Sequence, residues 1–340
     1  MRRNEFAMAS SFAAPGAVPA LSVVVPLFEE EAVVPVLVAR LTRVLDDLGL
    51  DAEVILVDDG SRDETLAAIA SAHHADPRFT GLALSRNFGH QLAISAGLAH
   101  ARGEAVVVMD GDLQDPPEAI PALWAKLGEG EGYDVVYAIR ASRPEGWWKR
   151  LAYRAFYRLL SRLAAFEVPL DAGDFSIMSR RVVARLNAMP ERRRFVRGLR
   201  AWVGFRQVGL PIDRAARHSG RPKFTLGKLL GLALDGFIGF SAAPLRWSGG
   251  LGALGVALAF LGLLGASIRG AVAGAWPSGW FAVGLLVLFS GGAQLLFVAI
   301  LGEYVGRIFQ EVNGRPLYVV RRRIGLKPRP RARRRARSRS

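Results

Sequence analysis

Cysteine is absent from this chain of 340 residues. Its absence excludes disulfide bonds, zinc sites built on cysteine and thiol nucleophiles, and it fits a reducing compartment. Acidic residues are absent from the C-terminal segment: residues 321–340 carry eleven Lys or Arg, so the remaining chain supplies only +4 of the net charge of +15 (15 − 11). The basic character therefore belongs mainly to a tail and does not by itself indicate a nucleic-acid-binding protein.

Charged residues are also missing from two long apolar stretches. Residues 247–268 and 280–302 contain none, and at 1.5 Å per residue each reaches about 33–35 Å, enough for the apolar core of a bilayer. We expect a transmembrane helix in each stretch. Arg246 precedes the first helix, and the basic tail, residues 307–340, follows the second. By the positive-inside rule both of these flanking segments lie in the cytoplasm. These stretches exclude an ordinary soluble domain.

The chain before these stretches alternates between two kinds of segment. Short β-branched runs predict strands, and segments with helical spacing lie between them. This alternation predicts an α/β domain over residues 20–225, with a Rossmann-like parallel sheet covered by helices on both faces, after a flexible leader at 1–19. Ligands of such sheets bind at the carboxyl ends of the strands. The predicted strands are 21–26, 53–58, 79–84, 104–109 and 134–140, and the helices are 30–49, 63–75 and 90–102.

Residues 146–165 carry four arginines at i+4 spacing beside an apolar, aromatic face. This pattern suits a helix that lies in the membrane interface. It also fits an ordinary surface helix that packs against a core, and the predicted transmembrane helices favour the interfacial interpretation.

Strand 104–109 runs into the acidic segment DGDLQDPPE, residues 110–118. Asp110 and Asp112 are two residues apart, and Gln114 adds an amide oxygen. Close carboxylates repel one another unless a cation lies between them, and such hard oxygen ligands suit Mg²⁺ or Mn²⁺, which complete their shell with substrate phosphates. The pattern therefore predicts a metal-bound diphosphate. A turn that caps the following helix would explain the prolines but not the adjacent oxygen donors.

Strand 53–58 ends in a second polar segment, DDGS (58–61). The Asp58 carboxylate can accept hydrogen bonds from a ribose or a base, although a plain Asp-Gly turn before a helix explains the same residues. Basic residues follow later, where a diphosphate would need them: Arg140, Arg214, Arg217 and Lys223. Arginine forks match phosphate oxygens, but each of these residues alone would also suit a solvated surface.

Eight segments in a fixed order carry a resemblance: PLFEE (26–30), DDGS (58–61), SRNFGHQLAISAG (85–97), DGDLQDPPE (110–118), GDFSIMSR (173–180), RFVRGLRAWVGF (194–205), RxxRxxGxxK (214–223) and LDGFIGFSAAPLR (234–246). Followed by two apolar stretches, they resemble the polyprenyl-phosphate glycosyltransferases, bacterial relatives of dolichyl-phosphate mannose synthase within the inverting family 2 glycosyltransferases. The resemblance is closest to the bacterial undecaprenyl-phosphate glucosyltransferase type. It implies a GT-A type domain for nucleotide-diphospho-sugars, with residues 146–165 and the helix at 226–246 lying on the membrane surface.

The resemblance also implies roles for individual residues. Asp112 and Asp174 are the implied catalytic carboxylates, and Asp110, Asp112 and Gln114 would hold the Mg²⁺ or Mn²⁺ ion. The implied nucleotide-sugar and diphosphate contacts are Pro26, Phe28, Glu30, Asp58, Asp110, Arg140, Arg217 and Lys223. Two positions depart from the family pattern, which more often has Tyr where this chain has Phe28 and Arg where it has Ser176. The role of that arginine is therefore missing or moved.

The implied reaction is displacement at the anomeric carbon with inversion. The oxygen of a polyprenyl phosphate attacks, and the nucleoside diphosphate leaves. Because a phosphate monoester is mostly dianionic at pH 7, we expect Asp174 to orient the sugar or the acceptor rather than to act as a general base. The expected donor is a UDP-sugar rather than a GDP-sugar, and the expected acceptor is undecaprenyl phosphate.

The expected location is the inner, cytoplasmic membrane, with two membrane passes and with the catalytic domain and tail in the cytoplasm. Relatives often form homotetramers, which leaves that assembly open here. No specific nucleic-acid partner is expected, because binding of nucleic acid by the tail would be electrostatic only.

Two other functions remain open at this stage. A processive polysaccharide synthase of the same superfamily would usually carry a Q-x-x-R-W motif, and here Arg246 and Trp247 are present but Ala243 replaces the glutamine. A membrane-anchored binding protein would use its basic tail to bind anionic lipid. Removal of residues 321–340 should leave an enzyme active and should abolish the function of such a binding protein.

Overall fold

The computed structural model describes residues 18–129, 132–140, 172–192, 194–213 and 279–326, with a few single residues or short pieces between 254 and 274. The chain forms two compact units. The first contains the sheet described below. The second contains the long helix α10 (Gly279–Val312). Each unit is described by itself.

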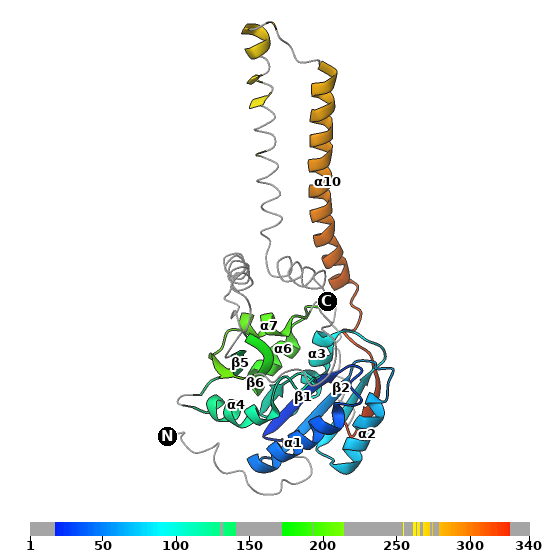
Figure 1. Cartoon of the computed structure of the whole chain (residues 1–340), viewed down its shortest axis with the longest axis vertical. Coiled ribbons are helices and arrows are strands. Elements are labelled where there is room, and N and C mark those ends of the chain that lie inside the picture. Colours follow the sequence, from blue (N-terminus) through cyan, green and yellow to red (C-terminus); the bar gives the residue numbers. More distant parts are fainter. Residues whose placement is uncertain are drawn as a thin grey trace, which may run out of the picture. The chain divides into compact units, whose positions relative to one another are not determined.

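A mixed sheet of eight strands forms the centre of the first unit, in the order β7-β5-β6-β4-β1-β2-β3-β8 (Figure 1). β4, β1, β2 and β3 run parallel to one another, which confirms the parallel arrangement expected for this part. β6 is antiparallel to both β4 and β5, and β8 is antiparallel to β3, so the sheet as a whole is not parallel as the sequence predicted. The strands are β1 (Leu21–Leu27), β2 (Ala52–Asp58), β3 (Phe79–Leu84), β4 (Ala105–Val108), β5 (Val135–Arg140), β6 (Ala172–Ser179), β7 (Gln207–Ile212) and β8 (Val320–Ile324).

Helices cover both faces of the sheet, as the sequence predicted (Figure 1). One layer contains α1 (Val34–Leu48), α2 (Thr65–Ala75), η1 (Pro117–Ala119) and α4 (Ile120–Leu127), and the other contains α3 (His90–His100), α6 (Arg180–Ala188) and α7 (Val196–Trp202). β1 and β2 are buried along their whole length. α3 packs so closely on these strands that a Cβ at Gly97 would overlap Val24 of β1.

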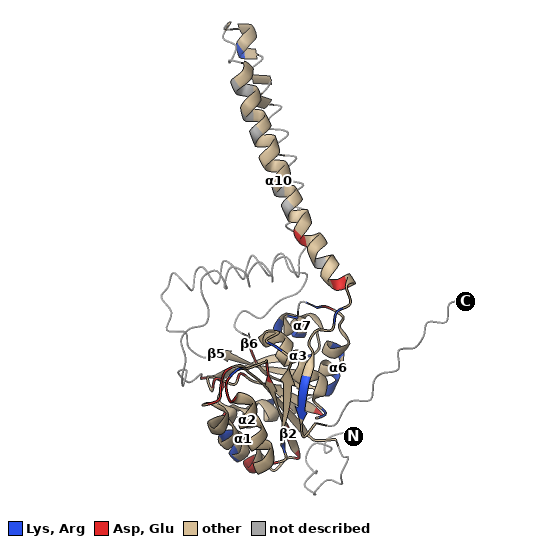
Figure 2. Cartoon of the chain, turned by 90° about the vertical axis from the view of Figure 1, so that its right-hand side faces the viewer, with Lys and Arg blue, Asp and Glu red and all other residues tan. Residues whose placement is uncertain are grey.

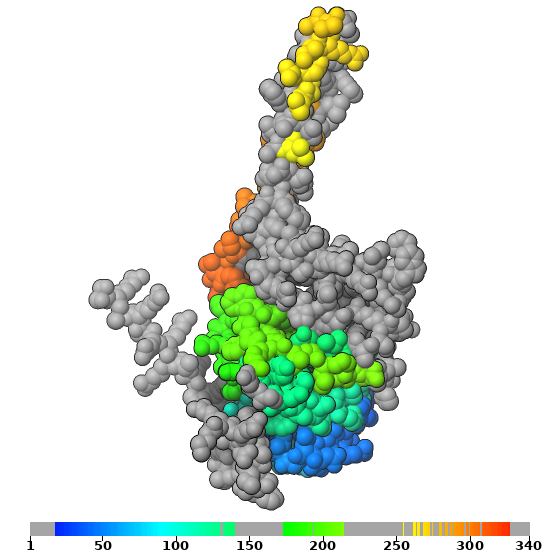
Figure 3. Space-filling view, turned by 90° about the vertical axis from the view of Figure 1, so that its left-hand side faces the viewer, coloured from blue at the N-terminus to red at the C-terminus, as the bar shows by residue number. Residues whose placement is uncertain are grey.

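Antiparallel pairing joins the two halves of this unit. β4 and β6 are hydrogen-bonded neighbours although a long segment of chain separates them. In the space-filling view the regions around 100–130 (teal) and 172–213 (green) form one continuous body (Figure 3). Segments before and after the undescribed residues 141–171 therefore build one site.

Strand β8 lies within the segment that the sequence analysis assigned to the basic tail. It pairs with β3, and the Ser85 N–H donates to the Val319 carbonyl at 2.8 Å. The Ile324 side chain is buried against Gly81, whereas Arg321, Arg322 and Arg323 are exposed and give the strand its blue colour in Figure 2. The start of the tail is thus part of the folded sheet.

In the second unit, α10 contains the sequence-predicted membrane segment 280–302. Its part Phe289–Val312 is, among the described residues, the one helix long and apolar enough to cross a membrane. Its acidic residues, red in Figure 2, lie towards its C-terminal end, at Glu303 and Glu311. The predicted first membrane helix (247–268) lies mostly outside the described residues, and the segments 146–165 and 226–246 lie wholly outside them.

Candidate active site

The loops that follow β1, β2 and β4 meet at the carboxyl ends of the parallel strands. The Glu29 N–H donates to Ser61 Oγ at 3.0 Å, and the Glu30 N–H donates to Thr65 Oγ1 at 3.0 Å, which ties the first loop to the second. Glu29 and Leu113 adopt φ values of 54° and 60°. Positive φ is uncommon for residues other than glycine, and such conformations cluster at functional sites.

Asp58, the last residue of β2, is fully buried between β1 and β3. Its Oδ1 accepts the Ser61 N–H at 2.9 Å, as the turn interpretation of DDGS requires. Its buried Oδ2 has no hydrogen-bond partner within the part of the chain that the structure describes. A buried carboxylate oxygen without a donor is costly. Asp58 therefore closes the turn with one oxygen only.

Asp59, its neighbour, holds the loop that leads into α3. Its two oxygens accept the N–H groups of Phe88 and Gly89, both at 2.8 Å. Burial raises the pKa of Asp59, and these two hydrogen bonds act in the opposite direction. Gly60 adopts a φ of 74° and lies so close to the backbone of Arg86 that a Cβ would overlap it. The turn after β2 thus fixes the start of α3.

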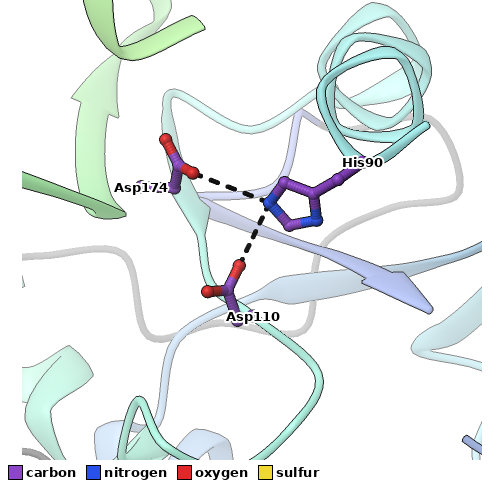
Figure 4. A group of neighbouring side chains, drawn as sticks. All are labelled: His90, Asp110 and Asp174. Atoms are coloured by element: carbon purple, nitrogen blue, oxygen red, sulfur yellow. Dashed lines mark ion pairs between the residues drawn. The ribbon is translucent and has the colours of Figure 1, made fainter. Parts of the chain in front are cut away.

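Asp110 and Asp174 face each other because β6 is antiparallel to β4. Val108 pairs with Ser176, so the same register continued by two residues brings Asp110 opposite Asp174. The imidazole of His90, the first residue of α3, lies between them (Figure 4). Its Nε2 is 3.3 Å from Asp110 Oδ1 and 3.6 Å from Asp174 Oδ2. Loss of water contact lowers the pKa of His90, but the hydrogen bonds and charges of the two carboxylates outweigh it and raise the pKa to about 10.

Asp174 is enclosed by donors in addition to His90. Its side chain is 10% exposed, and both of its oxygens lie within 3.3–3.4 Å of the Arg197 guanidinium. Gln91 Nε2 donates to Asp174 Oδ2 at 3.2 Å, and Gln91 Oε1 accepts the Val196 N–H of α7 at 2.8 Å. Burial raises the pKa of Asp174, but the charges and hydrogen bonds of Arg197 and His90 prevail and hold it well below its ordinary value. Asp174 is therefore ionised and a weak base.

Ser176, where the family pattern more often has arginine, donates from Oγ to the backbone carbonyl of Asp174 at 2.9 Å. The carboxylate of Asp174 is contacted instead by an arginine of α7, Arg197. Arg200, one turn further along α7, is buried and donates to the Gly173 carbonyl at 3.3 Å. Burial lowers the pKa of Arg200 to about 10.

His90, Asp110 and Asp174 each offer a ligand atom, and these atoms lie within 4.8 Å of one another. Such a set of oxygen and imidazole nitrogen donors can hold a divalent ion. The sequence-predicted set shares Asp110 but otherwise differs. Asp112 Oδ1 accepts the Gln114 N–H at 3.1 Å within the loop, and both side chains are half-buried.

The remaining predicted residues fall into two groups. Pro26 is buried in β1, and Phe28 and Glu30 are half-buried in the loop beyond it. Arg140 is the last residue of β5, but its side chain is not described, and Arg217 and Lys223 lie outside the described residues. Their diphosphate contacts stay predictions.

The sequence analysis assigned no role to His90, Gln91 or Arg197. The signal for the first two was available, because the loop after strand 79–84 ends at the same edge of the sheet as Asp58 and Asp110. No local signal distinguishes Arg197 from its neighbouring arginines.

The sheet, its helix layers and this carboxylate-rich edge define an α/β transferase of the GT-A type. The sequence profile described as Glycosyl transferase family 2 matches residues 22–186. An uncharacterised glycosyltransferase of Synechocystis is 41% identical over 311 residues, which cover 90% of this chain and 96% of the relative. The chain therefore belongs to the family 2 glycosyltransferases and is an enzyme of that class.

A relative of named activity is similar over the same span. The bactoprenol glucosyl transferase of Shigella phage SfII is 37% identical over 303 residues, which cover 89% of this chain and 97% of that protein. Among solved structures, the mannosyltransferase PcManGT from Pyrobaculum calidifontis, in complex with GDP-Man and Mn²⁺, has 18% identity and a TM-score of 0.46, covering 90% of this chain and 91% of that chain.

Proposed function

We propose that this enzyme transfers a sugar from a nucleoside-diphosphate sugar, with UDP favoured, to a polyprenyl phosphate such as undecaprenyl phosphate, with inversion at the anomeric carbon. The product would supply glycan modification of the cell envelope. The names of its phage relatives support the acceptor class. The observation that carries the proposal is the array at the carboxyl edge, where Asp110 and Asp174 lie on either side of His90.

On the donor side, Asp58 supports binding of the nucleoside. Its buried, unpartnered Oδ2 fits a hydrogen-bond donor of a base or ribose. Asp110 lies just beyond the end of β4, which pairs with β1. Its loop lies so close to β1 that a Cβ at Gly111 would overlap Leu27. The sugar diphosphate would extend from Asp58 towards Asp110.

The residues at this edge fit a divalent cation. We assign it to Asp110 and Asp112, with Gln114 as a third donor, because the oxygens of Asp174 already accept N–H groups from Arg197 and Gln91. Asp174 thus suits a metal less well than Asp110. A bound Mg²⁺ or Mn²⁺ ion would neutralise the charge that grows on the diphosphate leaving group.

On the acceptor side, Asp174 orients rather than accepts a proton. A carboxylate whose pKa is held far below its ordinary value is a poor base, and the dianionic phosphate needs none. Arg197 keeps this carboxylate ionised and fixed, and its cationic face suits an incoming phosphate. The fixed geometry then lowers the entropic part of the barrier.

The strand pairing supports two membrane passes. β3 and β7 precede α10 in the chain and β8 follows it, yet all three strands belong to one sheet. A sheet lies on one side of a membrane, so the chain between β7 and β8 would cross an even number of times. If α10 crosses once, a second crossing is needed before residue 279, where the uncharged stretch 247–268 lies.

Transfer of radiolabelled sugar from a panel of UDP- and GDP-sugars to undecaprenyl phosphate in detergent tests the proposal. We expect one donor to give a mild-acid-labile lipid product that requires Mn²⁺ or Mg²⁺ and is lost with EDTA. Asp110→Asn should abolish the product, whereas Asp47→Asn, an exposed aspartate on α1, should not change it. A product with many sugars per lipid would favour a processive synthase, and absence of product with every donor would favour a lipid-binding protein.

A further inference from the structure

Among the described residues, His90 forms ion pairs with a carboxylate from each half of the site. On one side is Asp110, at the end of β4, and on the other is Asp174, in β6 (Figure 4). Within the described part of the chain, the partner of the buried Asp110 Oδ1 is the His90 imidazole, whose Nε2 lies 3.3 Å away. The imidazole is therefore the bridge between the donor side and the acceptor side.

The two carboxylates need such a bridge. Their oxygens lie within 4.8 Å of each other and of the imidazole nitrogen. At that separation two negative charges repel, and a cationic group that lies close to both reduces the repulsion. Arg197 and Gln91 also contact Asp174. Arg197 and Gln91 thus fix Asp174, and His90 connects Asp174 to Asp110.

We propose that His90 is a positioning residue that holds Asp174 in register with Asp110, and thereby aligns the acceptor phosphate with the sugar diphosphate. This inference rests on the proposed function for the identity of the two ligands. His90 acts through the two carboxylates and is not itself a ligand of the divalent cation.

A chain of contacts sets the position of His90. Asp59 accepts the N–H groups of Phe88 and Gly89, the two residues directly before it. Gln91, directly after it, is fixed at both ends of its amide by Asp174 and Val196. The first turn of α3 is thus held on both sides, which fixes the backbone from which the imidazole reaches the two carboxylates.

Three variants of the full-length protein in detergent test this role. His90→Ala removes the bridge, and His90→Gln keeps an N–H donor near the position of Nε2 without the positive charge. His74→Ala, on the exposed side of α2, is the matched control. We measure kcat, the KM for the nucleotide sugar, and the dissociation constant of UDP with Mn²⁺ by calorimetry.

We expect His90→Ala to lower kcat about 100-fold, as a misplaced reacting group does, while the dissociation constant of UDP with Mn²⁺ and the KM for the donor stay within about threefold. His90→Gln should regain about tenfold in kcat, because a neutral donor restores part of the bridge. Unchanged kcat in His90→Ala would overturn the inference. Loss of UDP and Mn²⁺ binding in that variant would also overturn it, since His90 would then be a ligand.

A second readout does not depend on turnover. In the metal-free protein, His90→Ala should lower the thermal midpoint by about 2–4 °C, and by clearly less in an Asp174→Asn background, because the two side chains interact. Additive midpoints would overturn the inference. If no donor gives a lipid product but the midpoints are coupled, the proposed function fails and the bridge stands.

Discussion

At the scale of single residues, the two adjacent acids of the DDGS turn do different work. Asp58 closes the turn with one oxygen and leaves the other without a partner. Asp59 uses both oxygens to hold the loop before α3. One turn at the end of β2 therefore positions the first turn of α3 and, in the proposed function, would also receive the nucleoside. A substitution of Asp58 therefore tests ligand binding, and a substitution of Asp59 tests the position of α3.

Asp58→Asn should weaken binding of the donor and leave the fold intact. The Asn side-chain oxygen still accepts the Ser61 N–H, so the turn closes, but the charged oxygen that faces the ligand is lost. A hydrogen bond to a charged group contributes about 1.5–3 kcal/mol, so the KM for the nucleotide sugar should rise about 10- to 100-fold. Steady-state kinetics with a melting curve check this. An unchanged KM, or a midpoint several degrees lower, would contradict it.

Asp134, directly before β5, predicts a pH effect on stability. This buried carboxylate accepts Ser179 Oγ at 3.0 Å and forms a two-point ion pair with Arg181, both from the β6–α6 junction. Burial raises the pKa of Asp134, but Arg181 and Ser179 outweigh it and hold the pKa below its ordinary value. A lowered pKa stabilises the fold above the unfolded-state pKa of about 4, and that stability is lost as the pH falls further.

Asp134→Asn should therefore cost about 2 kcal/mol at pH 7, allowing for the exposed arginine. Its midpoint should approach that of the wild type as the pH falls from about 5 to about 3, because the wild type loses the ion pair in this range. Thermal melting in detergent across pH 3–7 measures the difference, with Asp47→Asn as the control. A gap between the two midpoints that is constant down to pH 3 would show that the charge of Asp134 does not matter.

At the scale of elements, β8 protects an edge of the sheet. Without it, β3 would present its unpaired N–H and C=O groups to other chains, and exposed edges promote aggregation. The pairing with β3 and the burial of Ile324 supply the strand's stability, and its three exposed arginines discourage further pairing. Because β8 includes residues 320–324, we now expect removal of residues 321–340 to destabilise the enzyme rather than to leave it unaffected.

Two truncations separate the strand from the rest of the tail. A chain ending at residue 326 should keep the thermal midpoint and the turnover of the full-length enzyme, because β8 is intact. A chain ending at residue 319 should melt several degrees lower and aggregate, because the edge of β3 is then bare. Size-exclusion chromatography and melting curves in detergent report both effects. Equal behaviour of the two truncations would mean that β8 contributes nothing to the fold.

The sequence predicted those elements whose signal is local. β1 to β4 and the helices between them follow from apolar runs and helical spacing, and Asp58 and Asp110 follow from their place after such runs. The direction of β6 and the existence of β8 depend on pairing between distant segments, which no local pattern encodes. The same holds for the contacts of Arg197 and Gln91 with Asp174, which join residues far apart in the chain.

At the scale of the whole molecule, the shared sheet constrains the membrane topology. β7 and β8 lie on the same side of any membrane, because one sheet contains both. α10 exposes large apolar side chains such as Phe289, Leu295 and Val298, as a lipid-facing helix does. A topology in which α10 crosses once and the chain does not return is incompatible with this sheet. We therefore propose two crossings, the second in the uncharged stretch 247–268 that precedes α10.

The absence of cysteine makes this topology directly measurable. A single cysteine in place of Ser278, between the two predicted spans, should react with a membrane-impermeant maleimide added to intact cells. A single cysteine in place of Ser338, in the basic tail, should react only after the membrane is opened, because the positive-inside rule keeps that tail in the cytoplasm. Labelling of the Ser338→Cys variant in intact cells, or protection of the Ser278→Cys variant until lysis, would contradict the two-pass arrangement and leave α10 without a partner crossing.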